Sequence, residues 1–291
     1  MKVGLFVPFG SANADPDLLG TAGQEIEARG FDSIWVAEHV VLFDEYASRY
    51  PYAPDGRFPA GGDAGLLEPF TALTYLASVT ERVRLGTGIC LVAQRNPVYT
   101  AKQVVDLDAL SSGRVDFGIG LGWLREEFEA LQMPFARRGD RTREHIEVMK
   151  TLWLDEVSEY HGELYELRPC RMYPKPVQQP HPPIHVGGES DAALRRVADF
   201  GQGWYTFNRP PDDLDAPLRS LDELLAERGR SRSDVTLSVC PYLQPAAPRM
   251  LDGYRERGVD RVIGLCLAFD RDTLLASLDQ LVTDLLEPAT A

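Results

Sequence analysis

The sequence is short of cysteine and of long apolar runs, and each shortage excludes a class of protein. Its four cysteines are far apart and form no Cys-x-x-Cys pair, which argues against a disulfide framework or a thiolate metal site. No apolar stretch approaches about 18 residues, the length needed to span a membrane. The apolar start, Val3–Phe9, is broken by Pro8 and is followed by no signal-peptide cleavage site, so we expect a cytoplasmic protein.

Positive charge is also scarce. The 291 residues include 30 Lys and Arg against 44 Asp and Glu, which gives a formal net charge of −14 at pH 7. Such a surface repels the phosphates of nucleic acid and of anionic lipid, so we expect neither as a partner. A composition that is 44% hydrophobic is ordinary for a globular protein, and we expect one barrel-sized domain over residues 1–291.

Short apolar runs alternate with amphipathic segments along the whole chain. Runs such as Ser33–Ala37 are apolar at consecutive positions, which is typical of parallel strands buried on both faces. Between the runs, apolar residues recur at steps of three and four, for example from Val98 to Ala109 and from Leu274 to Leu285. The eight predicted strands are Val3–Phe9, Ser33–Ala37, Val83–Ile89, Val115–Ile119, Pro183–Val186, Gly203–Phe207, Val235–Tyr242 and Val262–Leu267. Eight such alternations predict an α/β fold of the (β/α)8 barrel type over an open doubly wound sheet.

Two regions interrupt this alternation. Residues 40–68 follow the second strand, and their length and aromatic content predict a lid over the active-site end of the barrel. A plain surface loop is the alternative. Residues 156–182 contain a predicted hairpin around His161 and then a Pro-rich passage, so we expect an insertion before the fifth strand.

The active site of such a barrel lies at the carboxyl ends of its strands, which limits the candidates for chemistry. The second strand ends in Glu38-His39, a carboxylate and an imidazole that suit proton transfer near neutral pH, although a surface pair is the alternative. The ends of the third and fourth strands supply further candidates for contact with a cofactor. These are Thr87, Gly88, Ile89, Gly120, Gly122 and Trp123.

The fifth strand ends in Gly187-Gly188-Glu189-Ser190, directly before a predicted helix. Two glycines allow the backbone to approach a ligand closely. The helix that follows offers free N–H groups and the positive end of its dipole to a phosphate group. The turn is therefore a candidate cofactor site, and a tight turn with Ser190 as the helix N-cap is the alternative.

Other catalytic patterns are missing. The sequence contains no Gly-x-Ser-x-Gly elbow and no Walker A loop. His181 and His185 have two prolines between them, which prevents a helical metal-binding face, and we expect no metal. The arginine cluster of residues 137–143 is interpreted as a solvated helix start, with contact to an anionic cofactor tail as the alternative.

Several segments together resemble the luciferase-like monooxygenase superfamily. They are Gly30–His39, Thr80–Gly88, Leu107–Arg114, Gly118–Trp123, Lys175–Pro180, Pro183–Gly188 and Gly201–Trp204. The resemblance covers about Val3 to Phe207 closely and the remaining strands by pattern. It is nearest to the branch of oxidoreductases that use the deazaflavin coenzyme F420.

The resemblance implies roles for particular residues. His39 would lie beside the reacting ring of the cofactor, and Glu38 would contact the edge of that ring. The turn at Gly187, Gly188 and Ser190 matches the phosphate-binding turn of the family.

Three further positions follow from the same resemblance. The Gly88-Ile89 bond falls where the family holds a non-prolyl cis peptide. Sugar-phosphate dehydrogenases of the family carry a Glu where this chain has Trp123 and a Trp where it has Phe43, so sugar-phosphate oxidation is not expected.

The predicted function is hydride transfer between coenzyme F420 and a small organic substrate, with His39 as proton donor or acceptor. We expect Phe43, Tyr46 and Tyr50 in the substrate pocket, whose aromatic character favours a poorly charged, partly apolar substrate. The alternative is an FMNH2-dependent two-component monooxygenase of the alkanesulfonate type, with a flavin reductase as partner. A non-catalytic flavin-binding protein is a further alternative, because fold does not prove function. The resemblance also implies a homodimer.

Overall fold

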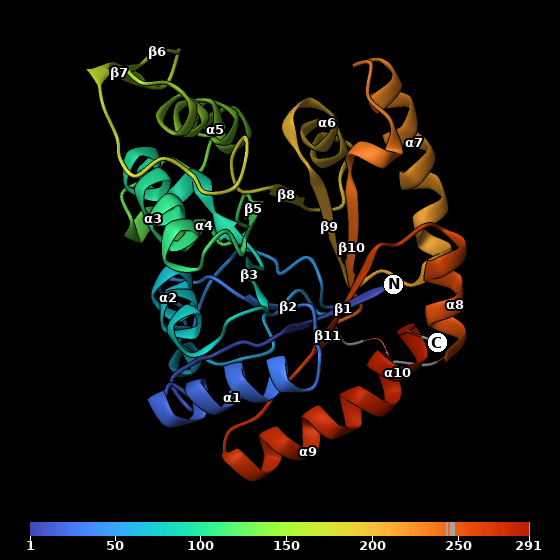
Figure 1. The fold of residues 1–291 in the computed structure, drawn as a ribbon. Coiled ribbons are helices and arrows are strands. Elements are labelled where there is room, and N and C mark those ends of the chain that lie inside the picture. Colours follow the sequence, from blue (N-terminus) through green and yellow to red (C-terminus); the bar gives the residue numbers. More distant parts are fainter. Residues whose placement is uncertain (243, 245–247, 291) are drawn as a thin grey trace.

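The computed structural model describes residues 1–242, 244 and 248–290, and its main sheet closes on itself as a barrel (Figure 1). The barrel strands are β1 (Lys2–Phe6), β2 (Ser33–Val36), β3 (Arg84–Thr87), β4 (Cys90–Leu91), β5 (Val115–Gly120), β8 (Ile184–Gly187), β9 (Gly203–Phe207), β10 (Thr236–Cys240) and β11 (Arg261–Leu265). Their pairings are parallel, β1 lies between β2 and β11, and the pairing of β3 with β5 completes the ring. The predicted (β/α)8 barrel is confirmed.

The third barrel strand is divided into β3 and β4. The division falls at the Gly88-Ile89 peptide, which is cis, as the family resemblance implies. Both parts pair with β5, through Leu85 and Gly86 in β3 and through Cys90 and Leu91 in β4. The chain therefore returns to the same barrel position after the interruption.

Helices cover the outside of the barrel (Figure 1). They are α1 (Pro16–Ala28), α2 (Pro69–Val79), α3 (Pro97–Leu110), α4 (Arg125–Ala130), α5 (Arg138–Leu154), α6 (Asp191–Phe200), α7 (Asp215–Ala226), α8 (Pro248–Glu256), α9 (Arg271–Leu281) and α10 (Glu287–Thr290). Asp15 and Asn96 cap α1 and α3 directly before a proline, and Ser190 caps α6, as the sequence predicts. No helix in the described ranges is long and apolar enough to cross a membrane.

Successive side chains of each barrel strand point alternately out of the barrel and into it, and the buried residues form two apolar clusters. Outward-facing residues such as Leu5 pack beneath the helices. Inward-facing residues, among them Phe6, Trp35 and Tyr205, fill the middle of the barrel. Gly86 has no room for a side chain, because a Cβ atom there would lie 2.4 Å from the Trp35 ring. The middle of the barrel is therefore a packed core and not a pore.

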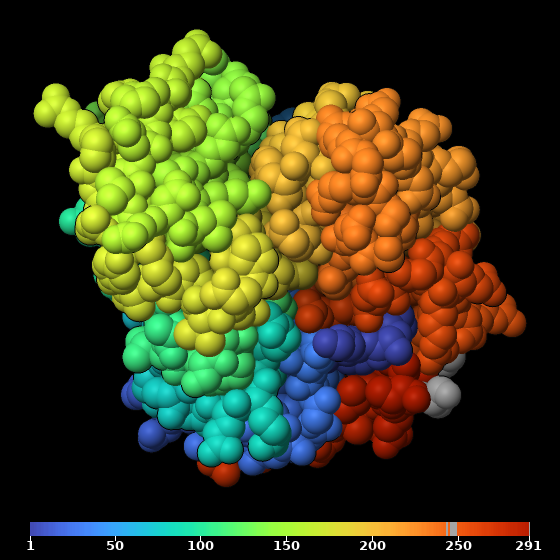
Figure 2. All heavy atoms as spheres, turned by 45° about the horizontal axis from the view of Figure 1, so that its top comes forward, coloured from blue at the N-terminus to red at the C-terminus, as the bar shows by residue number. Residues whose placement is uncertain are grey.

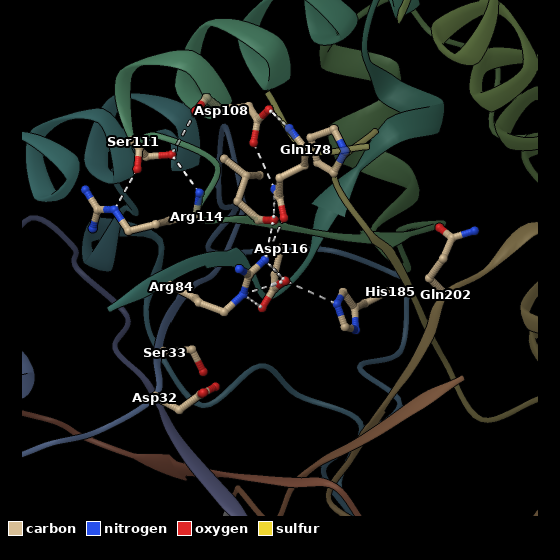
Figure 3. A network of polar contacts seen from close by, with 12 residues as sticks. Asp32, Ser33, Arg84, Asp108, Ser111, Arg114, Asp116, Gln178, His185 and Gln202 are labelled. Carbon is tan, nitrogen blue, oxygen red and sulfur yellow. Dashed lines mark hydrogen bonds and ion pairs between the residues drawn. The ribbon is translucent and has the colours of Figure 1, made fainter. Parts of the chain in front are cut away.

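Charged side chains fill the amino end of the barrel (Figure 3). Asp116 is 2% exposed and lies between two arginines, 2.6 Å from Arg84 Nη2 and 3.1 Å from Arg261 Nη1, with His185 Nε2 at 3.5 Å. Burial raises the pKa of Asp116, but His185 and the two arginines more than offset it and hold that pKa well below its ordinary value. Polar groups at this end of a barrel serve stability, and active sites lie at the opposite end.

Both predicted insertions are present. Residues 156–182 contain the antiparallel hairpin of β6 (Ser158–His161) and β7 (Glu166–Cys170), followed by the Pro-rich passage to β8. In Figure 2 this region, in yellow-green, lies at one corner of the molecule, apart from the orange α7. Residues 40–68 contain little regular structure beyond one turn of 3-10 helix, Gly62–Ala64, and a bridge between Leu66 and Gly10.

Candidate active site

A cavity of about 550 Å³ opens at the carboxyl ends of the barrel strands. Residues 40–68 cover part of it with Leu42, Tyr50, Tyr52 and Phe58. Apart from Glu38, His39 and Arg196, the described residues that line it are uncharged, and most of them are apolar or aromatic. Its volume and composition are those of a pocket for a cofactor or another small molecule.

His39 follows β2, and a buried carboxylate holds its imidazole. His39 Nδ1 lies 3.1 Å from Oε2 of Glu127, a fully buried residue in the first turn of α4. The same oxygen accepts a hydrogen bond from Gln94 Nε2 at 3.0 Å, and Oε1 accepts one from the Val40 N–H at 2.7 Å. Because Nδ1 faces Glu127, the Nε2 atom of His39 is left for a ligand.

Aromatic rings enclose His39. Its ring centroid lies 5.3 Å from that of Phe58 and 5.8 Å from that of Trp123, and these two neighbours stack on each other. Tyr50 packs against Trp123 at 5.3 Å. The enclosure shields the imidazole from bulk water, which strengthens electrostatic interactions at this position.

Two buried polar atoms of the lining have no hydrogen-bond partner within the described part of the chain. They are Nε1 of Trp123 and the hydroxyl oxygen of Tyr205. Leaving buried polar groups unpaired costs free energy, so such atoms need an explanation. A bound ring with polar substituents, as in a flavin or deazaflavin, would supply their partners, and the residues present fit such a ring.

Glu38 is buried beside His39, but its carboxylate already has protein partners. Its Oε1 accepts a hydrogen bond from Arg95 Nε at 2.6 Å, and its Oε2 accepts one from the Leu91 N–H at 2.5 Å. Arg95 also pairs with Glu68 at 2.6 Å. Glu38 therefore fixes the β4 segment beneath the cavity, in addition to bordering the cavity itself.

The turn after β8 also borders the cavity through Gly187, Gly188 and Ser190. Gly188 has a φ of +112°, and a Cβ atom there would lie 3.3 Å from that of Ala193 in α6. The Ser190 hydroxyl caps α6 by accepting a hydrogen bond from the Ala193 N–H at 3.3 Å. The amino end of α6, with its free N–H groups and positive dipole end, is thus turned toward the cavity.

Four of the predicted site residues lie outside the lining. Thr87 is buried between strands, where its hydroxyl donates to a β5 carbonyl at 2.6 Å. Glu189 turns to β9 and to an arginine beyond it, and burial raises its pKa. The Tyr46 ring packs against that of Trp123 with centroids 5.5 Å apart, and Phe43 is half-buried and does not contribute to the lining. The other predicted residues, among them Trp123 and Tyr50, do line it.

The structure adds residues that the sequence did not single out. Glu127 lies in the charged segment Arg125–Glu129, which has the pattern of a solvated helix face and gives no sign of a buried partner for His39. Phe207 and Tyr242, which also line the cavity, come from strands whose apolar runs predicted only a core. Their position at the strand ends was the available signal.

The chain is similar to known proteins over most of its length. A family model described as luciferase-like monooxygenase matches residues 1–249. An uncharacterized protein of Mycobacterium tuberculosis is 33% identical over 245 residues, which are 83% of this chain and 84% of that protein. The FMNH2-dependent dimethylsulfone monooxygenase of Pseudomonas putida is 33% identical over 191 residues, 64% of this chain and 52% of that enzyme.

A solved structure shares the whole fold at lower identity. The F420-dependent secondary alcohol dehydrogenase, solved with an F420–acetone adduct, superposes with a TM-score of 0.75 at 18% identity, over 99% of this chain and 98% of that one. At this level of identity the likeness concerns the fold. Among the described residues, no group of three or more His, Cys, Asp or Glu is suited to hold a metal ion.

Proposed function

The chain belongs to the luciferase-like monooxygenase family, and from this premise we propose that it transfers a hydride between coenzyme F420 and a small organic substrate. One observation carries the proposal. His39 and the Gly187–Ser190 turn open into the same apolar cavity, one suited to proton transfer and the other to a phosphate group.

The protein's share of the reaction is to bind, orient and exclude water. When bound, the deazaflavin supplies the hydride chemistry. The Gly187–Ser190 turn would hold a phosphate of the cofactor, and Gly88 and Ile89, which line the cavity, would contact its ring. Trp123 Nε1 and the Tyr205 hydroxyl would donate hydrogen bonds to polar atoms of the ring.

His39 is the proposed catalytic residue. Its Nε2 would exchange a proton with the substrate oxygen, while Glu127 fixes the orientation of the imidazole from the Nδ1 side. Phe58 and Trp123 would keep water away from His39 Nε2 and the substrate oxygen. Glu38 acts as a positioning residue through its bonds to Arg95 and to the backbone of Leu91.

The proposed substrate is poorly charged and partly apolar. The side of the cavity formed by β1, β9, β10 and β11 contributes only uncharged residues to the lining, including Phe6, Phe207, Tyr242 and Leu265. Tyr52 packs against Phe207 with ring centroids 4.8 Å apart and joins this wall to residues 40–68. We propose that residues 40–68 act as a lid that closes over this substrate.

A second candidate, an FMNH2-dependent monooxygenase supplied by a flavin reductase, is favoured by the 33% identity to the dimethylsulfone monooxygenase. The same turn and cavity would serve FMN. The two candidates differ in the cofactor that binds and in the need for O2, and not in the architecture of the site.

The deciding experiment is a titration of the purified protein with coenzyme F420 and with FMN, each oxidised and reduced, followed by fluorescence. The proposal expects F420 to bind more tightly and a pool of small alcohols and ketones to change its absorbance without O2. Preferred binding of FMNH2 with O2 consumption would replace the proposal by the monooxygenase. His39→Ala should keep cofactor affinity and lose about 10²–10⁴-fold in turnover. His161→Ala, on the exposed hairpin, is the matched control.

We also propose a homodimer, as the family resemblance implies. Light scattering of the purified protein at several concentrations tests this, and a monomer at every concentration would contradict it.

A further inference from the structure

Arginines without carboxylate partners gather beside the cavity, although the chain has an excess of acidic residues. Within the described residues, Arg125, Arg138 and Arg196 have no Asp or Glu oxygen within 4.0 Å of their guanidinium groups. Their neighbours behave differently, since Arg137 pairs with both Asp140 and Glu163. Within residues 137–143, Arg137 and Arg143 pair with carboxylates, whereas Arg138 does not and the buried Arg141 donates to the backbone carbonyls of Pro134 and Ala136.

The three side chains, here called the arginine patch, lie close together. The guanidinium carbons of Arg125 and Arg138 lie 4.3 and 3.9 Å from the ring centroid of the same Phe135. Arg138 Nε donates to the Gly122 carbonyl at 3.2 Å, and Arg196 Nη1 lies 3.7 Å from the Cβ position of Gly139. The patch thus joins the amino end of α5 to α6.

The patch is continuous with the cavity. Gly122 and Arg196 line it, and Arg196 lies on the same side of α6 as Ser190 and Ala193, which also line it. Burial and the charge of Arg125 lower the pKa of Arg138, and burial and the charges of Arg138 and Arg195 lower that of Arg196. Guanidinium groups held together without carboxylate partners form a site suited to a carboxylate or phosphate anion.

One phosphate is too small an anion for this arrangement. The Gly187–Ser190 turn already offers a phosphate site, and Arg196 follows the N-cap Ser190 by six positions, about 9 Å along the helix axis. An anion that continues from the turn with further carboxylates would reach the patch. The tail of coenzyme F420 has this chemistry, with glutamates linked beyond its phospholactate, whereas FMN ends at its phosphate.

We propose that the arginine patch binds the glutamate carboxylates of the F420 tail and thereby selects long-tailed deazaflavin over FMN. This inference rests on the proposed function. Arg196 and Arg138 would pair with successive carboxylates, and Arg125 would add charge at the outer edge.

The test compares two deazaflavins, one that ends at its phospholactate and one with five or six glutamates. The wild type should bind the long-tailed form about tenfold more tightly at low salt, as two or three partly exposed ion pairs would give. This preference should shrink as NaCl rises from 50 to 300 mM. Arg196→Gln should lower affinity for the long-tailed form and leave affinity for the short form nearly unchanged.

Arg195→Gln is the matched control, because Arg195 precedes Arg196 on α6, is exposed and does not line the cavity. It should bind both forms as the wild type does. Equal losses for both forms in Arg196→Gln would show that Arg196 holds only the phosphate, and would overturn the inference.

If the wild type binds the short-tailed and the long-tailed deazaflavin equally, the inference about the arginine patch is also overturned, while the proposed function stays intact. Binding of FMN with no deazaflavin binding would instead refute the proposed function.

Discussion

The contact between Glu127 and His39 leads to the sharpest prediction about catalysis. Replacing Glu127 by Gln keeps the size of the side chain, and its amide oxygen retains an acceptor for the Val40 N–H, now 2.7 Å from Oε1. The amide nitrogen would then face His39 Nδ1, which lies 3.1 Å from Oε2. An N–H donor at this position makes Nδ1 an acceptor and moves the ring proton to Nε2, the reverse of the arrangement that a carboxylate favours.

The expected result is a loss of about 10²–10⁴-fold in turnover, or about 3–5 kcal/mol of transition-state stabilisation. Affinity for the cofactor should change little, because Glu127 touches His39, Val40 and Gln94 and not the lining of the phosphate turn. Turnover is measured on the substrate found in the pool, and cofactor affinity and thermal melting on the same preparation.

The neighbouring Glu126 provides a control of the same chemistry. Its carboxylate accepts hydrogen bonds from the Ala47 and Ser48 N–H groups at 2.7 and 3.2 Å and does not contact His39. Glu126→Gln should therefore leave turnover near the wild-type value. If Glu127→Gln and Glu126→Gln lose turnover equally, or if Glu127→Gln keeps wild-type turnover, then Glu127 does not orient His39.

Three further predictions test other parts of the site and fold. Gly188→Val should lose about 1–3 kcal/mol of stability and most cofactor affinity. Gly229→Val is the control, because Gly229 also has a positive φ but no atom lies near its Cβ position, and it should lose stability alone. Thermal melting and cofactor titration of both variants test this difference. Tyr205→Phe should keep stability within about 1 kcal/mol and weaken cofactor binding, and unchanged affinity would mean that this hydroxyl does not meet the ligand. Asp116→Asn should lose about 3–5 kcal/mol in urea unfolding at pH 7. Because the pKa of Asp116 is depressed in the folded state, its contribution to the free energy of unfolding is present above about pH 4 and declines below it. The difference in unfolding free energy between the wild type and Asp116→Asn should therefore narrow at pH 3.5. A difference that stays constant with pH would refute this account.

The sequence by itself determined the barrel, because its signals are local. Short apolar runs that alternate with capped helices are typical of parallel strands buried on both faces, and they can be recognised without knowing the tertiary contacts. The caps at Asp15, Asn96 and Ser190 and the turn at Gly187–Ser190 lie where local signals placed them, whereas the division of the third strand, predicted as the single run Val83–Ile89, was not foreseen.

Only the tertiary structure decided which side chains meet. Glu38 and His39 are adjacent in the sequence, yet one carboxylate is bound by Arg95 and the neighbouring imidazole by Glu127, because successive side chains leave the strand end in different directions. Thr87 and Glu189 hydrogen-bond to neighbouring strands and do not line the cavity, and neither do Phe43 and Tyr46 of the irregular segment 40–68. Arg138 and Arg196 are 58 positions apart, and only closure of the barrel brings α5 and α6 together as unpaired positive charge. Periodicity fixes the elements, whereas packing fixes the direction of each side chain, and the site depends on those directions.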